Sequence, residues 1–133
     1  MAVTLLDGIE AVMAAAGQEL GVSDWLELTG DRASLFDSVV GPGAREFLVL
    51  SLSNHFLPQI LEVRGVSMGI NYGTDRVRFG SPVGMGARLR ASARMIAAHP
   101  IPGGAQTTIH ITVEEEGRSE PACEIDSLSR WLV

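Results

Sequence analysis

The chain has 133 residues, of which 46% are hydrophobic, and its formal net charge is −6 at pH 7. This length fits one domain over residues 1–133 with a sizeable core. The negative charge disfavours non-specific binding to nucleic acids or anionic membranes. All ten basic residues are arginines, which excludes Schiff-base chemistry on a lysine. Cys123 is the only cysteine, so an intrachain disulfide is excluded and a reducing cytoplasm is favoured.

Two helices are predicted ahead of the centre of the chain. Apolar residues recur at helical spacing over residues 3–20, which predicts a helix on the outside of the domain. Thr29 is suited to cap a second helix over residues 31–38. We expect Leu35 and Phe36 of this second helix to face the core.

The stretch over residues 44–57 is apolar on nearly every side, and a helix of this kind is usually enclosed by other elements. Pro42 and Gly43 precede it and Pro58 follows it, as expected at helix boundaries. At about 1.5 Å per residue it would extend roughly 20 Å, too short to cross a bilayer core of about 30 Å. We therefore predict a buried helix around which the rest of the domain is organised.

From Leu61 onward the apolar residues alternate with polar ones, which is typical of strands. The predicted strands cover residues 61–72, 75–79, 87–97, 106–115 and 121–132. Turns are expected at residues 73–74, 81–84 and 116–118, and a loop at 99–104. Closely spaced strands after one buried helix imply an α+β domain in which an antiparallel sheet curls around that helix.

Three stretches of the chain carry a family resemblance. They are Gly21-Val22-Ser23-Asp24-Trp25, the helical segment around Phe47-Leu48-Val49-Leu50, and Ile70-Asn71-Tyr72-Gly73-Thr74-Asp75-Arg76-Val77-Arg78-Phe79 with the following Pro82-Val83-Gly84. Together they resemble the MaoC-like hot-dog family of (R)-specific enoyl-CoA hydratases and dehydratases. The resemblance implies an antiparallel sheet wrapped on a long central helix, and dimers with pockets at the interface. We therefore expect a homodimer, or a heterodimer with another hot-dog chain.

The resemblance fails at the catalytic segment. The family carries an aspartate with a histidine five positions later, a pair that activates the water added to the enoyl double bond. In one alignment Asp31 matches the family's aspartate, but Phe36 stands five residues later, where the histidine would be. A second alignment places a deletion at Gly41-Pro42-Gly43, and this deletion removes both catalytic residues. The family's Ala-His-Gly turn then reads Ala44-Arg45-Glu46. Because general acid–base catalysis contributes about 10²–10⁴ in rate, we expect ordinary enoyl-CoA hydration to be weak or absent.

Arg45, Glu46 and Tyr72 are the candidate catalytic residues. The resemblance places the thioester carbonyl near the start of the central helix. Glu46 would then act as a replacement acid or base, and Arg45 as an electrostatic anchor. The alternative is that Arg45 and Glu46 pair with each other or with a neighbour and close the shortened loop.

Asn71, Gly73 and His55 are the candidate substrate-binding residues. In the family, the strand that corresponds to Asn71 and Tyr72 borders the pocket; the alternative is a hydrogen-bonded strand end. His55 lies inside the apolar helix, where a lone histidine is more often a core or interface residue than a catalyst. The histidines are too scattered for a metal site, and we expect no metal and no cofactor.

Five arginines occupy shared faces of the alternating strands: Arg76, Arg78, Arg88, Arg90 and Arg94. They are suited to binding the phosphates of coenzyme A, or alternatively they form a solvated face of the sheet. We expect Cys123 to be a small core residue.

Three functions remain open. The first is an enzyme derived from enoyl-thioester hydratases or dehydratases that now performs another lyase, cyclase or isomerase reaction. Its substrate would be an acyl-CoA, a carrier-protein thioester or a polyketide-like molecule. The second is a non-catalytic subunit of a MaoC-like heteromeric hydratase. The third is an acyl or small-molecule binding module.

Overall fold

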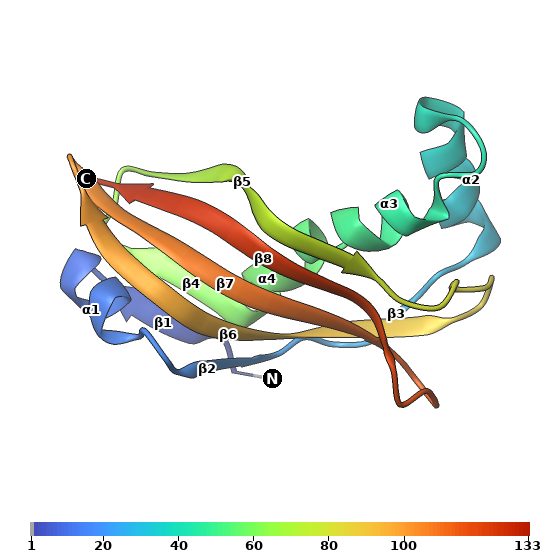
Figure 1. Cartoon of the computed structure of the whole chain (residues 1–133), viewed down its shortest axis with the longest axis horizontal. Helices are drawn as coiled ribbons and strands as arrows, with labels where there is room; N and C mark the ends of the chain where they lie inside the picture. The colour runs from blue at the N-terminus through green and yellow to red at the C-terminus, as the bar shows by residue number, and fades with distance from the viewer. Residues whose placement is uncertain (1) are drawn as a thin grey trace.

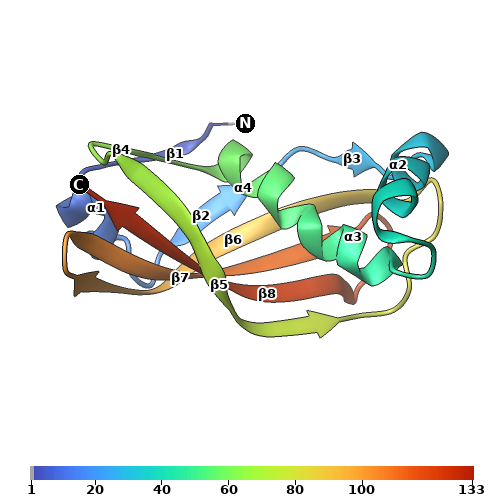
Figure 2. The same ribbon diagram turned by 90° about the horizontal axis from the view of Figure 1, so that it is seen from above.

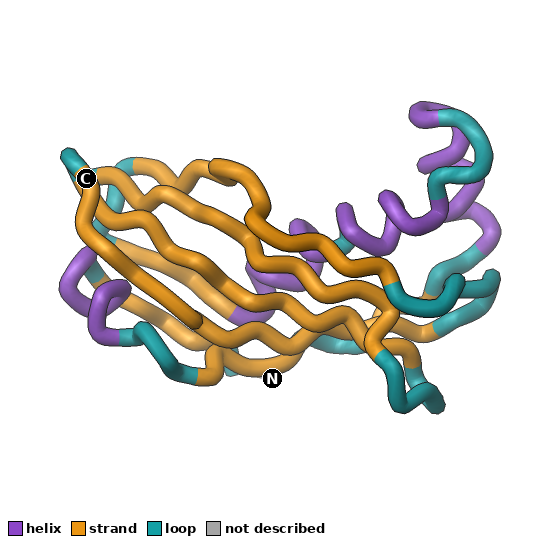
Figure 3. The backbone as a smooth tube through the Cα atoms, viewed as in Figure 1, coloured by secondary structure: helices purple, strands orange, loops and turns teal. Residues whose placement is uncertain are grey.

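The computed structural model describes residues 2–133. Its main feature is a six-stranded sheet with the strand order β2-β6-β7-β8-β5, in which β3 also pairs with β6. The strands are β2 (Glu19–Val22), β3 (Leu26–Glu27), β5 (Met68–Phe79), β6 (Arg88–Ile101), β7 (Gly104–Glu115) and β8 (Pro121–Leu132). All pairings in this sheet are antiparallel. Figures 1 and 3 show the long strands as one curved layer.

The central helix consists of α3 (Arg45–Ser51) and α4 (Ser53–Ile60), which meet at Leu52. Figure 2 shows the two helices running one after the other along the sheet. The prediction that the helix ends before Pro58 is wrong, because α4 continues through this proline to Ile60. Ile60 is 1% exposed, and its burial offsets the backbone hydrogen bond that a proline removes from a helix interior.

One side of the central helix remains open to solvent within a single chain. Leu48 and Val49 are buried, whereas Phe47 is 55% exposed. The sheet covers only one side of α3 and α4, so the predicted enclosure of this helix holds for its sheet-facing residues alone.

The helix α2 (Gly30–Val40) begins where the sequence predicts. The hydroxyl of Thr29 accepts a hydrogen bond from the backbone N–H of Arg32 at 3.3 Å, which confirms the cap. The helix stands away from the sheet at one end of the molecule (Figure 1). Because of this position the prediction for Leu35 is wrong, since its side chain is 70% exposed. Phe36 does pack against the core, half-buried.

The N-terminal segment is not the single helix predicted over residues 3–20. It contains β1 (Thr4–Asp7), α1 (Ile9–Ala14) and β2. The strand β1 pairs in parallel with β4 (Leu61–Arg64), which directly follows the central helix. This pairing joins residues far apart in the sequence and overrides the local helical pattern.

The prediction of one strand over residues 61–72 is wrong, because β4 and β5 are separate strands. The turn predicted at residues 73–74 is also wrong, since β5 continues there beside β8 with two register shifts. The loop predicted at residues 99–104 is shorter than expected, because β6 and β7 extend into it. Because these segments pair with neighbouring strands, they form irregularities within the strands instead of turns.

The strands β6, β7 and β8 follow the predicted alternation. Their inward side chains form most of the core, and they include Leu89, Ala91, Ala93, Met95, Ile109, Ile111, Val113, Cys123 and Ile125. β5 forms one end of the sheet and has no strand on its outer side within residues 2–133. The groove between this open edge and the central helix contains the cavities described next.

Candidate functional site

Two cavities lie along the same side of the central helix. We call the first the Arg45 cavity; its volume is about 220 Å³ and it is lined by Arg45, Glu46, Val49, Phe79, Gly80, Ser81, Pro82, Val83 and Ala122. We call the second the Trp131 cavity; its volume is about 320 Å³ and it is lined by Ser53, Asn54, Leu57, Pro58, Leu61, Val63, Gly69, Ile70, Asn71, Ile111, Ser127, Ser129 and Trp131. Their helical residues recur every fourth position, which places them on one helix face.

The Arg45 cavity combines one charged end with apolar walls. Arg45 and Glu46 belong to the first turn of α3, and the opposite wall comes from the end of β5 and the loop that follows. The rings of Phe47 and Phe79 meet edge to face with their centroids 5.6 Å apart. This contact joins α3 to β5 beside the cavity.

Arg45 has no charged partner among residues 2–133. Its Nε atom is buried without a hydrogen-bond acceptor, and its side chain donates only a weak hydrogen bond to the sulfur of Met85 at 3.4 Å. Glu46 is exposed, and neither residue forms an ion pair within residues 2–133. The cavity is therefore lined by a cation and a carboxylate that lack protein counter-charges within residues 2–133.

The connection from α2 to α3 is short. Gly41 and Gly43 adopt φ values of 89° and 88°, a conformation that residues with a Cβ rarely adopt. They turn the chain from α2 directly into Ala44 and the first turn of α3. This tight connection sets Arg45 and Glu46 at the mouth of the cavity.

Polar residues of three neighbouring strands are paired in register beside the Trp131 cavity. Ser129 lies between Thr107 of β7 and Asn71 of β5 in the strand register. The indole N–H of Trp131 donates to the Thr107 hydroxyl at 3.0 Å. A Cβ at Gly69 would lie 2.7 Å from the Trp131 ring, so only glycine fits beneath this tryptophan.

The structure does not bring all the candidate residues together. Arg45 and Glu46 share one cavity, and Asn71 lines the other. Tyr72 is exposed, and the Cζ atom of Arg130 lies 3.7 Å from the centre of its ring. His55 is exposed next to the Phe56 ring, and neither it nor Gly73 lines either cavity.

Sequence reasoning missed Ser127 and Ser129. Both are buried, at 8% and 5% exposed, and both line the Trp131 cavity. The alternation of β8 could have predicted their position, because every second residue from Cys123 and Ile125 onward points to the same inward face of the sheet.

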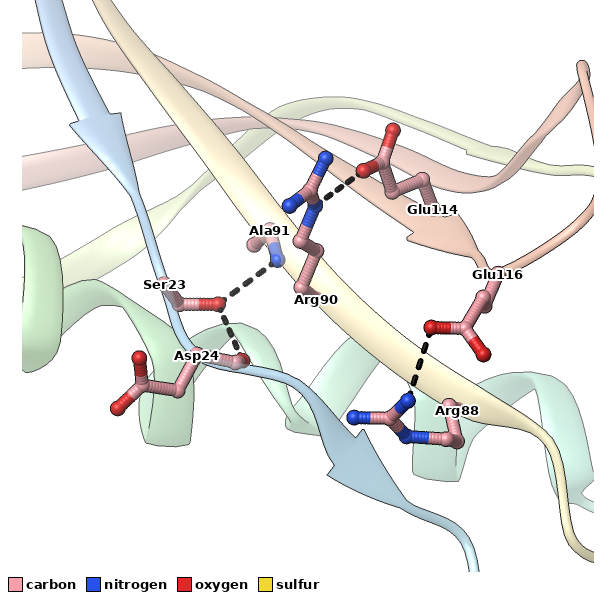
Figure 4. A network of polar contacts seen from close by, with 7 residues as sticks. All are labelled: Ser23, Asp24, Arg88, Arg90, Ala91, Glu114 and Glu116. Atoms are coloured by element: carbon pink, nitrogen blue, oxygen red, sulfur yellow. Dashed lines mark hydrogen bonds and ion pairs between the residues drawn. The ribbon is translucent and has the colours of Figure 1, made fainter. Parts of the chain in front are cut away.

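On the other face of the sheet, arginines are engaged with carboxylates. Arg88 pairs with Glu116 at 2.9 Å, and Arg90 pairs with Glu114 (Figure 4). The guanidinium carbon of Arg90 also lies 4.4 Å from the centre of the Trp25 ring. These contacts support a solvated sheet face for these two arginines.

The polar network of Figure 4 also holds the segment that precedes β3 against the sheet. The backbone N–H of Ala91 donates to the Ser23 hydroxyl at 2.9 Å, and this hydroxyl donates to the Asp24 carbonyl at 3.0 Å.

Cys123 is buried in the core as predicted. Burial raises the pKa of its thiol to about 11, and the neighbouring Glu124 carboxylate acts in the same direction. The thiol therefore stays protonated at neutral pH and is not a nucleophile.

Comparison with known proteins identifies the family. No protein-family model matches the chain. The 3-hydroxyacyl-thioester dehydratase Z of Mycobacterium tuberculosis is 32% identical over 146 residues, which covers 95% of this chain and 97% of that protein. This chain belongs to the MaoC-like hot-dog family. The α+β hot-dog prediction is thereby confirmed.

Solved structures agree with the hot-dog fold. The monoamine oxidase regulatory protein of Archaeoglobus fulgidus superimposes with a TM-score of 0.75 at 18% identity, over 98% of this MaoC-like chain and 97% of that one. A MaoC-like dehydratase from Rhodospirillum rubrum gives 0.66 at 14% identity, over 89% and 92% of the two chains.

The alignment with the mycobacterial protein is longer than this chain. It spans 146 residues, against the 133 that the chain contains. Some residues of the mycobacterial protein therefore have no counterpart here.

None of the helices within residues 2–133 is long and apolar enough to span a membrane. In the same part of the chain, His, Cys, Asp and Glu side chains form no group of three or more that is placed to hold a metal ion.

Proposed function

We propose that this MaoC-like chain is an enzyme that performs a lyase, cyclase or isomerase reaction on an acyl-thioester or polyketide-like substrate in the Arg45 cavity. The observation that carries the proposal is that Arg45 and Glu46 line one largely apolar cavity and neither is paired with a protein charge. A half-buried guanidinium without a counter-ion favours a ligand that brings negative charge or develops it.

Each of the two charged residues has a role in this chemistry. The Arg45 guanidinium faces the thioester carbonyl oxygen and stabilises the negative charge that develops on it. Glu46 transfers the proton as general base and then general acid. The apolar side chains of Val49, Phe79 and Val83 line the cavity beside both charged groups and lower the local dielectric constant, which strengthens both electrostatic contacts.

Ring closure is the reaction that fits this pair best. A hydroxyl oxygen of the substrate bonds to the β-carbon of an enoyl thioester while Glu46 accepts the hydroxyl proton. The electrons of the double bond move to the carbonyl oxygen beside Arg45. Return of the proton from Glu46 to the α-carbon restores the carbonyl and the carboxylate. Such an internal addition depends on positioning of the two reacting groups and needs no activated water.

We also propose that a second hot-dog chain covers the open edge of β5, most simply a second copy of this chain. The edge borders three partly exposed apolar side chains, Phe47, Val77 and Phe79. An uncovered edge strand of this length is prone to uncontrolled pairing, and a symmetric dimer closes it. The partner would then form part of the groove that holds both cavities.

A second function is favoured by a separate observation. The mycobacterial dehydratase has residues without a counterpart in this shorter chain, and Arg45 and Glu46 stand where the family resemblance expects a histidine and a glycine. Both facts suit a non-catalytic subunit of a heteromeric hydratase or an acyl-binding module. Co-purification with a second, catalytic hot-dog chain supports this alternative.

The test is loss of enoyl absorbance with two substrate panels and purified protein. One panel contains simple trans-2-enoyl-CoA thioesters, and the other contains enoyl thioesters that carry a hydroxyl placed for ring closure. We expect turnover of the second panel and little or none of the first.

Variants make this test specific. Glu46→Gln should lower turnover by about 10²–10⁴-fold, while the matched variant Glu10→Gln, at an exposed glutamate of α1, should preserve it. The enzyme proposal fails if Glu46→Gln and Arg45→Ala leave all turnover intact.

A further inference from the structure

The inner face of β8 contains polar side chains where the fold requires apolar ones. Ser127 and Ser129 occupy inward positions next to the core residue Ile125, and both are buried. Neither hydroxyl takes part in a side-chain hydrogen bond within residues 2–133, in contrast to Thr107, whose hydroxyl accepts from Trp131. Since both serines line the Trp131 cavity, their hydroxyls are free to hydrogen-bond a molecule that enters it.

The two serines face a cavity large enough to hold such a molecule. The Trp131 cavity, about 320 Å³ in volume, brings Asn71 from β5 and Asn54 from α4 to the same space. Leu57, Ile111 and Trp131 form apolar walls around them. The cavity thus combines apolar surface with hydroxyl and amide groups, and it contains no charged lining residue.

The Trp131 cavity is in line with the Arg45 cavity. Arg45 and Val49 line one, and Ser53 and Leu57 line the other, at successive intervals of four residues along the helix. A rise of 1.5 Å per residue separates Arg45 from Ser53 by about 12 Å along the helix axis. A chain-like ligand that reacts at Arg45 therefore places a remote segment among the serines.

We infer that the Trp131 cavity is a specificity subsite for a neutral acyl chain bearing a hydroxyl or keto oxygen remote from its thioester. This inference rests on the proposed function for the identity of the ligand as an acyl thioester. A plain alkyl chain would bury the Ser127 and Ser129 hydroxyls without partners. An oxygen at that depth would accept from them, or donate to them and to Asn71. A site built to bind a substrate oxygen discriminates strongly against the analogue that lacks it.

The test is a binding measurement that requires no turnover. Calorimetry compares the saturated dodecanoyl thioester of N-acetylcysteamine with the same thioester carrying a hydroxyl at its penultimate carbon. Neither ligand has an enoyl double bond to react. We expect the hydroxylated ligand to bind roughly 3- to 10-fold more tightly for each hydrogen bond gained.

Variants assign the preference to the serines. In the double variant Ser127→Ala/Ser129→Ala the two ligands should bind equally, whereas Ser127→Thr, which retains a hydroxyl, should keep the preference. Ser119→Ala, at an exposed serine outside both cavities, is the matched control and should bind like the parent protein. Thermal unfolding of each variant shows that the change is not a loss of folding.

Several outcomes would overturn the inference. They are equal affinity of the parent protein for both ligands, no binding of either, or a preference that survives in the double alanine variant. Binding of pantetheine alone that is lost in the double variant would assign the serines to the thioester arm instead of the acyl chain.

Failure of this inference and failure of the proposed function are distinguishable. A serine-dependent preference in a protein whose turnover ignores Glu46→Gln supports the subsite and rejects the proposed chemistry. Turnover that requires Glu46 without any serine-dependent preference supports the proposed chemistry and rejects the subsite.

Discussion

At the scale of single residues, Arg45 illustrates a conflict between stability and ligand binding. Its Nε atom is buried without an acceptor, and an unsatisfied buried polar group destabilises the folded state by about 1–3 kcal/mol. In the proposed site, this unpaired guanidinium in the cavity wall would bind an anionic or carbonyl group of the ligand. The neighbouring Glu46 is exposed and forms no ion pair within residues 2–133, so under the proposed function both side chains would serve the ligand.

Arg45→Met should separate these two roles. The methionine keeps much of the side-chain volume and removes the unpaired guanidinium, so the free energy of unfolding should stay the same or rise by about 1 kcal/mol. Turnover of a hydroxy-enoyl thioester should nevertheless be lost, because the developing oxyanion loses its donor. Urea unfolding and enoyl absorbance measure the two effects. A marked loss of stability would show that Arg45 is structural.

Glu46→Gln should lower turnover by about 10²–10⁴-fold, the contribution typical of general acid–base catalysis. The amide retains the shape of the carboxylate but cannot exchange the proton. The rate with a hydroxy-enoyl thioester is the measurement. An unchanged circular dichroism spectrum serves as the control for folding.

The Cys123 thiol should couple to stability at high pH. Its pKa is raised to about 11 from the ordinary 9.0, so the folded state retains the proton that the unfolded chain releases first. Its contribution is therefore complete below pH 9 and is lost as the pH rises toward 11. Urea titrations of the parent protein and of Cys123→Ala across this range should converge at high pH. Parallel curves would contradict the assignment.

At the scale of elements, β5 depends on a close contact with β8. Gly69 lies beneath the Trp131 ring, and a Cβ at this position would approach the ring to 2.7 Å. The tryptophan is in turn held by its hydrogen bond to Thr107 on β7. Three strands are thus tied together at the floor of the Trp131 cavity, which makes the cavity sensitive to one methyl group.

Gly69→Ala should therefore destabilise the protein by about 1–3 kcal/mol, the usual cost of overpacking. Gly84→Ala is the matched control, because a Cβ added at Gly84 would meet nothing within 4 Å and the φ of this residue is not positive. The control should change the free energy of unfolding by less than about 0.5 kcal/mol. Equal effects of the two substitutions in urea unfolding would refute the close contact.

At the scale of the whole molecule, the curved sheet leaves one edge and one helix side uncovered. The open edge of β5, the exposed Phe47 ring and the groove with its two cavities all lie on this side. An association that covers them would close the sheet edge and deepen the groove at once. Under the proposed assembly, association and ligand binding would therefore be coupled.

Val77→Glu should weaken this assembly. Val77 is partly exposed on β5, and a carboxylate there would be desolvated when a second chain covers the edge. Sedimentation velocity should show a dimer for the parent protein and a monomer for the variant. Ile96→Glu, at an exposed apolar residue of β6, is the control and should remain dimeric. A monomeric parent protein without a second hot-dog partner would contradict the proposed assembly.

Local chemistry in the sequence determined much of this protein. The period-two alternation predicted β6, β7 and β8 because each strand keeps one face on the core. Thr29 predicted the start of α2 because its hydroxyl satisfies a free N–H of the first helical turn. The family resemblance pointed to Arg45 and Glu46 because they stand where it expects a histidine and a glycine.

Tertiary structure alone decided the rest. Residues 4–7 form a strand because β4 offers them a partner far along the chain, and α4 continues through Pro58 because Ile60 is buried in the core. Asn71 and Tyr72 are adjacent in sequence, yet one lines a cavity and the other stacks with Arg130. Pairing, register and burial join residues distant in sequence, and local periodicity carries no record of such contacts.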